Sequence, residues 1–241
     1  KTILSLVTYS LIITANDSLN NANNISINIT ITEQESSLVI TLNSPADNNA
    51  TSSNTINFNC SATDAGGLSN ISLWTNYSGS WQMNKSQQLL GTSNSSLISM
   101  SGMKDGSYNW SCSANDTLTN WGMATANRTF LIDSVPPVVT LISPNDLITT
   151  ANSTLYLNCT ATDNFGITNI SMWTNYSGSW QMNTSVAVSG SYAQNQFAFA
   201  GLKSGSYNWS CGANNTINFA MATTNRTFTT DSVPPTVTLN S

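Results

Sequence analysis

The stretch GSYNWSCSAND, residues Gly106–Asp116, decides the fold class of this chain. Its apolar residues Tyr108, Trp110, Cys112 and Ala114 alternate with polar ones. Alternation with a period of two is typical of a β-strand that has one face in a core and the other in solvent. Because Cys112 belongs to the apolar set, we expect its side chain to point into that core.

Three long stretches of the chain occur twice. GSYNWSCSAND returns as GSYNWSCGANN at 205–215, NISLWTNYSGSWQMN at 70–84 returns as NISMWTNYSGSWQMN at 169–183, and NRTFLIDSVPP at 127–137 returns as NRTFTTDSVPP at 225–235. The offset is about 99 residues throughout, which is the size of one small β-sandwich. The chain is therefore expected to contain tandem copies of one domain.

Four cysteines occupy matching positions in the two copies, as the pairs Cys60 with Cys112 and Cys159 with Cys211. Neither pair has the close CxxC spacing of a zinc site. The even count and the long, repeated separation predict two disulfides and an oxidising compartment. Because each cysteine lies in an apolar register, each disulfide should join two sheets through a core. Closing a loop of about 50 residues should stabilise each copy by about 4 kcal/mol.

The composition excludes several classes of function. The chain has 241 residues, a net charge of −5 and only 7% charged residues. Its six Lys and Arg are scattered, and a chain without a basic stripe is not expected to bind nucleic acid. Histidine is absent, which removes the commonest general base and metal ligand. No apolar run approaches the roughly 18 residues of a membrane span, so none is expected in this segment.

The cysteine pattern and several short phrases resemble a known family. Paired cysteines on an early and a late strand, with Trp74 and Trp173 shortly after the first, resemble the immunoglobulin fold. The phrases ATD, GSYxWxC, AND and TFxxDSVPPxVTL are similar to the tandem immunoglobulin-like repeats of archaeal and bacterial surface proteins: S-layer components, adhesins and filaments. The resemblance covers nearly the whole chain. It implies an all-β fold of tandem immunoglobulin-like β-sandwiches at the cell surface.

The sequence departs from antibody domains at one position. Antibody domains carry a corner Tyr two residues before the second Cys. Here Trp110 and Trp209 stand there, and Tyr108 and Tyr207 lie two residues earlier. The sequence therefore leaves open whether the corner hydrogen bond of the tyrosine forms.

The orientation of the repeated tryptophans follows from their neighbours. Trp74 shares a strand face with Asn70 and Asn76, which are both glycosylation acceptors by sequence. A glycan cannot point into a core. We therefore expect Trp74 and its counterpart Trp173 to face outward.

The repeat pattern predicts four segments. Residues 1–37 resemble the closing strands of a preceding repeat, because ANDSLNN at 15–21 matches ANDTLTN at 114–120. The remaining segments are complete repeats at 38–136 and 137–235, and the first strand of a following repeat at 236–241. The alternative is that ILSLVTYSLII after Lys1 is a signal peptide, but the polar residues within that run and the repeat match favour the repeat interpretation.

The first segment carries an alternating isoleucine run that needs a facing sheet, formed by Ile25, Ile27, Ile29 and Ile31. A two-stranded hairpin alone is marginal in water. We expect the missing strands to come either from the same polypeptide or from a neighbouring subunit.

Asn-x-Ser/Thr triplets, the acceptors of N-linked glycans, are about twice as frequent as this composition gives by chance. We expect substantial glycosylation, with some sites unfilled, and sugar hydroxyls would then replace charges in solvating the surface. The acceptors are Asn16, Asn24, Asn28, Asn49, Asn59, Asn70, Asn76, Asn84, Asn94, Asn109, Asn115, Asn127, Asn152, Asn158, Asn169, Asn175, Asn183, Asn208, Asn214 and Asn225.

Carboxylates near the repeat junctions predict calcium sites. Two or three carboxylates together with carbonyl oxygens suit Ca²⁺. The alternative is that Asp133 and its counterpart Asp231 only cap the turn before the Pro-Pro pair that follows each of them. The candidate ligands are Glu33, Glu35, Asp64, Asp116, Asp133 and Asp163.

Together these features predict a structural repeat module of an extracellular, N-glycosylated filament, stalk or S-layer-like protein, and not an enzyme. Its expected partners are neighbouring repeats or other copies of the same protein, and its own covalent glycans. The alternative is a carbohydrate- or cell-binding adhesin, because aromatic rings could stack on sugars around the SGSW turns. Those rings belong to Tyr77, Trp81, Tyr176 and Trp180.

Overall fold

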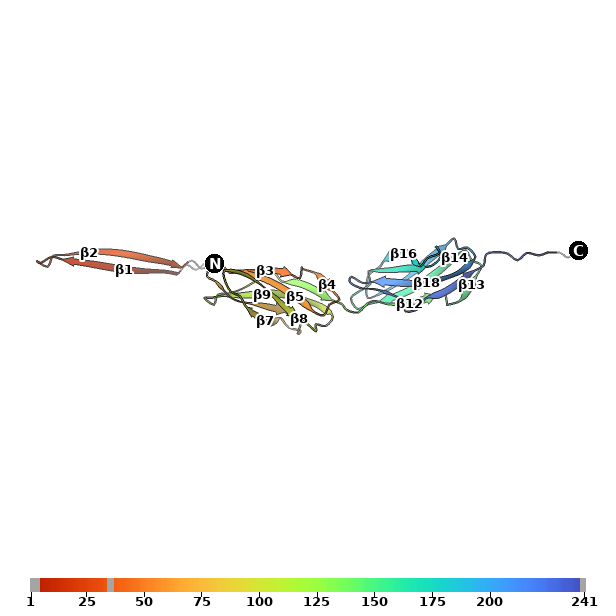
Figure 1. The fold of residues 1–241 in the computed structure, drawn as a ribbon, viewed down its shortest axis with the longest axis horizontal. Coiled ribbons are helices and arrows are strands. Elements are labelled where there is room, and N and C mark those ends of the chain that lie inside the picture. The colour runs from red at the N-terminus through yellow and green to blue at the C-terminus, as the bar shows by residue number, and fades with distance from the viewer. Residues whose placement is uncertain (1–4, 34–36, 239–241) are drawn as a thin grey trace. The chain divides into compact units, whose positions relative to one another are not determined.

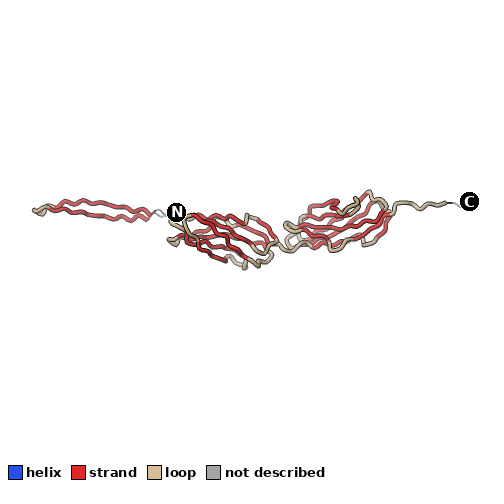
Figure 2. Tube along the Cα trace, viewed as in Figure 1, coloured by secondary structure: helices blue, strands red, loops and turns tan. Residues whose placement is uncertain are grey.

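The structure is a computed structural model that describes residues 5–33 and 37–238, with side chains from 8–29 and 37–238. Every regular element in these residues is a β-strand, as Figure 2 shows. This confirms the predicted all-β class. Within the described residues, no helix is present that could cross a bilayer.

The second complete repeat forms a β-sandwich of two sheets (Figure 1). One sheet has the order β12-β14-β17, and the other has the order β13-β20-β18-β15-β16 with β19 added beside β18. Neighbouring strands run antiparallel except β13 and β20, which are parallel. The strands are β12 (Val138–Ser143), β13 (Ile148–Thr150), β14 (Thr154–Thr162), β15 (Asn169–Thr174), β16 (Gln181–Ala187), β17 (Tyr192–Ala200), β18 (Gly205–Asn214), β19 (Phe219–Met221) and β20 (Arg226–Thr230).

The core of this sandwich lies between the inward faces of its two sheets. Alternate residues of β14 and β18 point inward, because successive side chains of a strand lie on opposite faces. Leu157 on β14 and Trp209 on β18 are completely buried there, with Phe228 of β20. The predicted half-buried antiparallel strands are therefore confirmed in this repeat.

The first complete repeat has the same two sheets. Their orders are β3-β5-β8 and β4-β11-β9-β6-β7, with β10 beside β9. The strands are β3 (Val39–Ser44), β4 (Asn49–Thr51), β5 (Ile56–Thr63), β6 (Leu68–Thr75), β7 (Gln82–Gln88), β8 (Ser93–Met100), β9 (Gly106–Asp116), β10 (Trp121–Met123) and β11 (Arg128–Ile132).

Each sandwich carries the predicted disulfide between its two sheets. Cys60 on β5 bonds to Cys112 on β9, and Cys159 on β14 bonds to Cys211 on β18. The Cα–Cα separations are 6.5 and 6.6 Å, and both bonds close loops with a sequence separation of 52. All four cysteines are buried, as their apolar register predicts.

The N-terminal segment forms a separate two-stranded hairpin of β1 (Ser5–Asn16) and β2 (Ala22–Glu33). The register pairs Leu11 with Ile27 and Ile13 with Ile25, so these side chains share one face. They are 44–59% exposed. The predicted facing sheet concerns an assembled form and stays a prediction. The side chain of Ile31 lies outside the described residues.

By their backbone contacts the residues group into two compact units, whose limits differ from those of the predicted repeats. Of the described residues, one unit comprises 5–33, 37–46, 57–99 and 109–128, and the other comprises 47–56, 100–108 and 129–238. The repeat limits 38–136 and 137–235, and the flanking segments 1–37 and 236–241, stay predictions.

Candidate functional site

An outward-facing tryptophan is the centre of the candidate site in each sandwich. Met172 and Ile170 of β15 are buried, whereas Trp173 on the same strand is only half-buried. In the first sandwich Leu73 is buried and Trp74 is half-buried. The prediction that Trp74 and Trp173 face outward is confirmed.

The strand registers place a defined set of residues on the same side as Trp173. Cross-strand partners lie on one face of a sheet. Between β15 and β18 the partners on this face are Trp173–Ser210, Ser171–Gly212 and Asn169–Asn214. Between β18 and β19 they are Gly212–Met221 and Asn214–Phe219, so all of these residues lie on the same face. We call this set the outer face of the second sandwich. It consists of Asn169, Ser171, Trp173, Asn175, Asn208, Ser210, Gly212, Asn214, Phe219 and Met221.

The rings of Trp173 and Phe219 cover part of the outer face, and we call this pair of rings the aromatic roof. The Trp173 indole Nε1 donates to Ser171 Oγ at 2.9 Å, and its ring lies 6.2 Å from the ring of Phe219. A Cβ atom on Gly212 would lie 2.7 Å from the Phe219 ring, so this position accepts only glycine while the ring lies there. Ser210 is completely buried although it lies on the outward side. The roof therefore makes a small apolar layer outside the sheet.

The first sandwich repeats this arrangement with its own residues. The Trp74 Nε1 donates to Ser113 Oγ at 2.8 Å. Trp121 pairs with Asn115 in the register of β10, where the second sandwich has Phe219. Trp121 is 57% exposed and Phe219 is 46% exposed. We call the corresponding set (Asn70, Ser72, Trp74, Asn76, Asn109, Ser111, Ser113, Asn115, Trp121 and Met123) the outer face of the first sandwich.

Four acceptor asparagines surround each outward tryptophan. In the second sandwich Asn169 and Asn214 are direct cross-strand partners on one side of Trp173. Asn175 and Asn208 lie on the other side, where Asn208 N donates to Asn175 Oδ1 at 2.8 Å. The first sandwich has the equivalent pairs Asn70 with Asn115 and Asn76 with Asn109, and the backbone N of Asn109 donates to Asn76 Oδ1 at 2.8 Å.

None of the acceptor asparagines predicted from sequence is buried. Their glycosylation is not tested by the structure and stays a prediction. The exposed acceptors are Asn16, Asn24, Asn28, Asn94, Asn109, Asn127, Asn152, Asn183, Asn208 and Asn225. The half-buried acceptors are Asn49, Asn59, Asn70, Asn76, Asn84, Asn115, Asn158, Asn169, Asn175 and Asn214.

The aromatic residues of the SGSW turns divide into two kinds. Trp81 and Trp180 are 38% and 40% exposed. Tyr176 instead packs against the rings of Phe199 and Tyr207, at centroid distances of 5.2 and 4.9 Å. Its hydroxyl donates to the carbonyl of Gly201. Tyr77 is half-buried. Of the four rings proposed for sugar contacts, those of the tryptophans are the more accessible.

The predicted calcium ligands Asp133 and Asp163 lie together with a buried amide between them. Asn215 Nδ2 donates to Asp133 Oδ2 at 2.6 Å and to Asp163 Oδ2 at 3.0 Å. Asn215 Oδ1 accepts from the backbone N of Ile217 and of Asn218, which fixes the orientation of the amide. A donor nitrogen therefore lies between one oxygen of each carboxylate, and calcium binding at these two residues stays a prediction.

Electrostatics at this cluster disfavour further negative charge. Burial raises the pKa of Asp133, and the carboxylates of Asp163 and Asp105 raise it further, against hydrogen bonds from Val135 and Asn215 that lower it. Asn218 Nδ2 also donates to the Asp133 carbonyl at 2.9 Å. The cluster holds the segment after β11 by hydrogen bonds.

The other predicted calcium ligands act in local turns or are not described. Asp64 and Asp116 are buried. The Asp116 carboxylate accepts from the backbone of Leu118 and Asn120. Glu33 ends β2, and its side chain and the whole of Glu35 lie outside the described residues. Among the described side chains, no three His, Cys, Asp or Glu form a group that could hold a metal.

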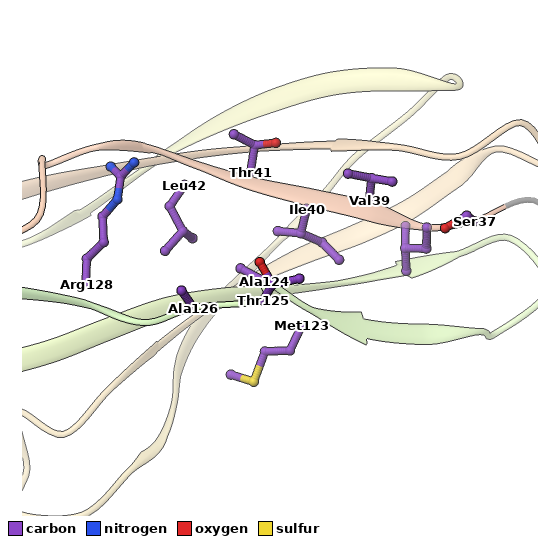
Figure 3. A pocket seen from close by; sticks show the side chains of 11 residues that line it. Ser37, Val39, Ile40, Thr41, Leu42, Met123, Ala124, Thr125, Ala126 and Arg128 are labelled. Carbon is purple, nitrogen blue, oxygen red and sulfur yellow. The ribbon is translucent and has the colours of Figure 1, made fainter. Parts of the chain in front are cut away.

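A shallow groove runs beside the edge strand β3 of the first sandwich. Figure 3 shows Ile40 and Leu42 pointing from β3 toward Ala124 and Ala126 of the segment after β10. Arg128 lines the same groove and donates from Nη1 to the carbonyls of Asn43 and Pro45. Through these contacts Arg128, at the start of β11, links the edge strand β3 to the other sheet of the sandwich.

Sequence reasoning missed the aromatic roof of the outer face. It located Trp74 and Trp173, but gave no role to Trp121 or Phe219. These residues belong to three-residue strands, which are too short to show alternation. The substitution of Gly212 for Ser113 at the matching repeat position is the one signal of close contact that the sequence contains.

Comparisons with known proteins agree with the architecture. Residues 95–189 match the family model of the bacterial Ig-like domain, group 3. This match is about one repeat long and supports the resemblance to immunoglobulin-like surface repeats. No curated protein matches the chain significantly.

Two of the solved structures similar to this chain consist of fibronectin-type modules and have low sequence identity to it. The fibronectin(III)-like modules of Clostridium thermocellum CbhA are 15% identical, with a TM-score of 0.46, over 84% of this chain and 100% of theirs. The chicken CNTN1 FN1-FN3 domains are 11% identical, with a TM-score of 0.39, over 92% of this chain and 75% of theirs.

Proposed function

We propose that this chain is a structural repeat module of an extracellular, N-glycosylated filament, stalk or S-layer-like protein. The observation that carries the proposal is the placement of its acceptor asparagines. None of them is buried, whereas the nearby non-acceptor Asn215 is 5% exposed and binds two carboxylates. A surface with many acceptors and few charges suits a module that is solvated by sugar.

The disulfides support the extracellular location. Disulfides persist in oxidising compartments and are rare where thiols are kept reduced. Both bonds lie in sandwich cores and close long loops, and such bonds stabilise a domain mainly by restricting its unfolded chain. A repeat that stabilises itself in this way suits a protein exposed outside the cell.

The polar chemistry of the chain suits a non-catalytic role. The chain has no histidine. The carboxylates of Asp116, Asp133 and Asp163 accept hydrogen bonds that order their own loops. A catalytic pair would need a carboxylate directed at a substrate position.

The second candidate is a carbohydrate- or cell-binding adhesin, and the exposure of Trp81 and Trp180 favours it. Binding of the full chain to a glycan array, lost on replacing both residues by alanine, would support this candidate. Absence of binding together with fibrous assembly would support the structural module.

The test of the main proposal is the intact mass of the chain, isolated from its natural source, before and after enzymatic removal of N-linked glycans. We expect a large loss of mass, and peptide mapping should place sugars on outer-face asparagines. An unchanged mass would overturn the glycosylated module.

A further inference from the structure

We propose that the outer face of each sandwich is a platform for the chain's own N-linked sugars. The assigned occupant is the first saccharide joined to Asn169 or Asn214 in the second sandwich, and to Asn70 or Asn115 in the first. The proposal rests on the proposed glycosylation and adds where the sugar lies. The ring of Trp173 or Trp74 is the surface on which it packs.

The direction of the indole selects this pair of asparagines. Trp173 donates from Nε1 to Ser171 Oγ, two residues earlier on the same strand. The ring therefore leans toward Asn169 and away from Asn175, since these residues flank it on one face. Trp74 leans the same way, because its partner Ser113 pairs with Ser72.

A second aromatic residue stands beside the same pair. Phe219 is the direct cross-strand partner of Asn214, and its ring lies 6.2 Å from that of Trp173. In the first sandwich Trp121 is the partner of Asn115. Each selected pair of acceptors therefore has one aromatic ring leaning toward it and another at its side.

The chemistry of a pyranose fits this surface. The axial C–H groups of one sugar face are apolar and pack on the face of an aromatic ring, while the hydroxyls at the rim remain in water. Aromatic rings offer a large apolar area in a rigid side chain. The exposed rings of Phe219 and Trp121 would otherwise remain in contact with water, which is unfavourable for apolar surface.

The four acceptors around each tryptophan also argue against a flat protein partner. Sugars at any of these positions would stand between the outer face and an approaching protein surface. Asn169 lies four residues before Trp173 on β15, about 13 Å along the strand, and Asn214 is its cross-strand partner. The indole spans about half of this distance, because its Nε1 donates to Ser171, two residues earlier on the strand. A saccharide attached at Asn169 or Asn214 can therefore reach the ring without any rearrangement of the sheet.

The experiment measures how fast sugar is released at each position of the natively folded full chain. The chain is secreted from a host that adds N-linked glycans, and peptide mass spectrometry records occupancy. An endoglycosidase that cuts between the first two sugars is then added, and its progress is followed at each asparagine. A first sugar held against a ring should be cut slowly.

Replacing Trp173 by alanine should raise release at Asn169 and Asn214 by about threefold to tenfold. Release at Asn70 and Asn115 should stay unchanged, and Trp74→Ala should give the reverse pattern, so each sandwich is the control for the other. Trp173→Phe, which retains a ring, should keep most of the protection. Tyr192→Ala removes an exposed ring on the other sheet and should change neither pair.

The outcomes separate this proposal from the proposed function. Sugars elsewhere on the chain but on neither Asn169 nor Asn214 would overturn the platform and leave the glycosylated module standing. A bare chain would overturn both. An unchanged rate of sugar release at Asn169 and Asn214 in Trp173→Ala would overturn the platform. The same holds if Trp173→Ala loses self-association of the chain while the release rate stays unchanged.

One further variant covers the possibility that alanine unfolds the sandwich. Faster release at the distant Asn152 as well would report unfolding. Trp173→Leu then decides, because leucine keeps an apolar cover on the sheet without a ring. Faster release confined to Asn169 and Asn214 in that variant supports the platform, and unchanged release there overturns it.

Discussion

Arg226 ties the edge of one sheet to the core of the second sandwich. Its guanidinium donates to the carbonyls of Leu141, Ile142 and Pro144 at 2.7, 3.0 and 2.6 Å. It also lies 5.9 Å from the ring centre of the buried Trp209. The planar guanidinium can serve several carbonyls at once, which a lysine ammonium on a flexible stem does less well.

We expect Arg226→Ala to reduce the free energy of unfolding of this sandwich by about 2 kcal/mol, because hydrogen bonds and a cation–π contact are lost together. Arg226→Lys should recover less than half of that loss. The control Lys203→Ala alters an exposed side chain and should change stability by less than about 0.5 kcal/mol. Urea unfolding measures the stability of all three variants. A lysine variant as stable as the wild type would refute this role of the Arg226 guanidinium.

The tyrosine corner forms in both sandwiches, although the sequence left open whether its hydrogen bond would form. Tyr207 Oη donates to the carbonyl of Lys203 at 3.2 Å, and Tyr108 Oη donates to that of Lys104 at 3.0 Å. Trp209 meanwhile fills the core position two residues before the cysteine. The tyrosine hydrogen bond thus forms from a position two residues earlier than in antibody domains.

The amide of Asn215 leads to a prediction about calcium. Its Nδ2 separates Asp133 from Asp163, so we expect CaCl₂ to leave the thermal midpoint of the wild type unchanged. Asn215→Asp should be less stable without metal, because three carboxylates then meet in a buried cluster. A few millimolar CaCl₂ should restore its midpoint by several degrees, since such a group suits Ca²⁺. Asn152→Asp at an exposed position is the control.

A calcium-dependent rise in the wild type would contradict this geometric argument. It would instead support the calcium sites that the sequence predicts at the junctions. Differential scanning calorimetry with and without chelator distinguishes the two results.

At the scale of elements, strands that alternate could be predicted from sequence and edge strands could not. The cysteines and the apolar residues of β9 and β18 gave both the sandwich and the disulfides. β16 has no such pattern, because every residue in it is exposed. Its place is set by pairing with β15, and a polar edge also discourages contact with other sheets. The parallel pairs β4–β11 and β13–β20 depend on the tertiary arrangement in the same way.

The candidate site shows the same limit. The sequence placed Trp74 and Trp173 outward because their neighbours on the strand are acceptors. It could not show that Phe219 lies over Gly212, because that contact depends on how β19 pairs with β18. The alternation of apolar and polar residues along a strand assigns a side chain to one face of the sheet. It does not show which aromatic ring covers which residue.

The β1–β2 hairpin is the element most exposed to unwanted association. Leu11 and Ile27 are paired at the centre of its exposed apolar face. Lysine at both positions should lower the fraction of self-associated chain, because charge on an open strand face opposes sheet-to-sheet contact. The control is Leu19→Lys in the turn, where the side chain is 82% exposed. Light scattering across a concentration series measures the effect, and equal association in both variants would argue against this face.

At the scale of the whole molecule, the surface is solvated mainly by neutral groups. Only 7% of the residues are charged, and the six Lys and Arg limit how many ion pairs the chain can form. Hydrogen bonds between neutral side chains, such as those from Thr75 to Asn84 and from Thr174 to Asn183, recur at matching positions of the two repeats. Such bonds are not weakened by salt screening as exposed ion pairs are.

We therefore expect the thermal midpoint of the full chain to change by less than about 2 °C between about 0.02 and 0.2 M NaCl, a range in which the screening length falls roughly threefold. The net charge of −5 is small for a chain of 241 residues, so screening of overall repulsion should add little. Thr174→Val removes a neutral hydrogen bond and should lower the midpoint equally at both salt concentrations. Thr174→Lys instead buries an unpaired charge and should lower it further. A strong salt dependence in the wild type would show that the few charges, and not the Asn, Ser and Thr surface, determine the stability of this molecule.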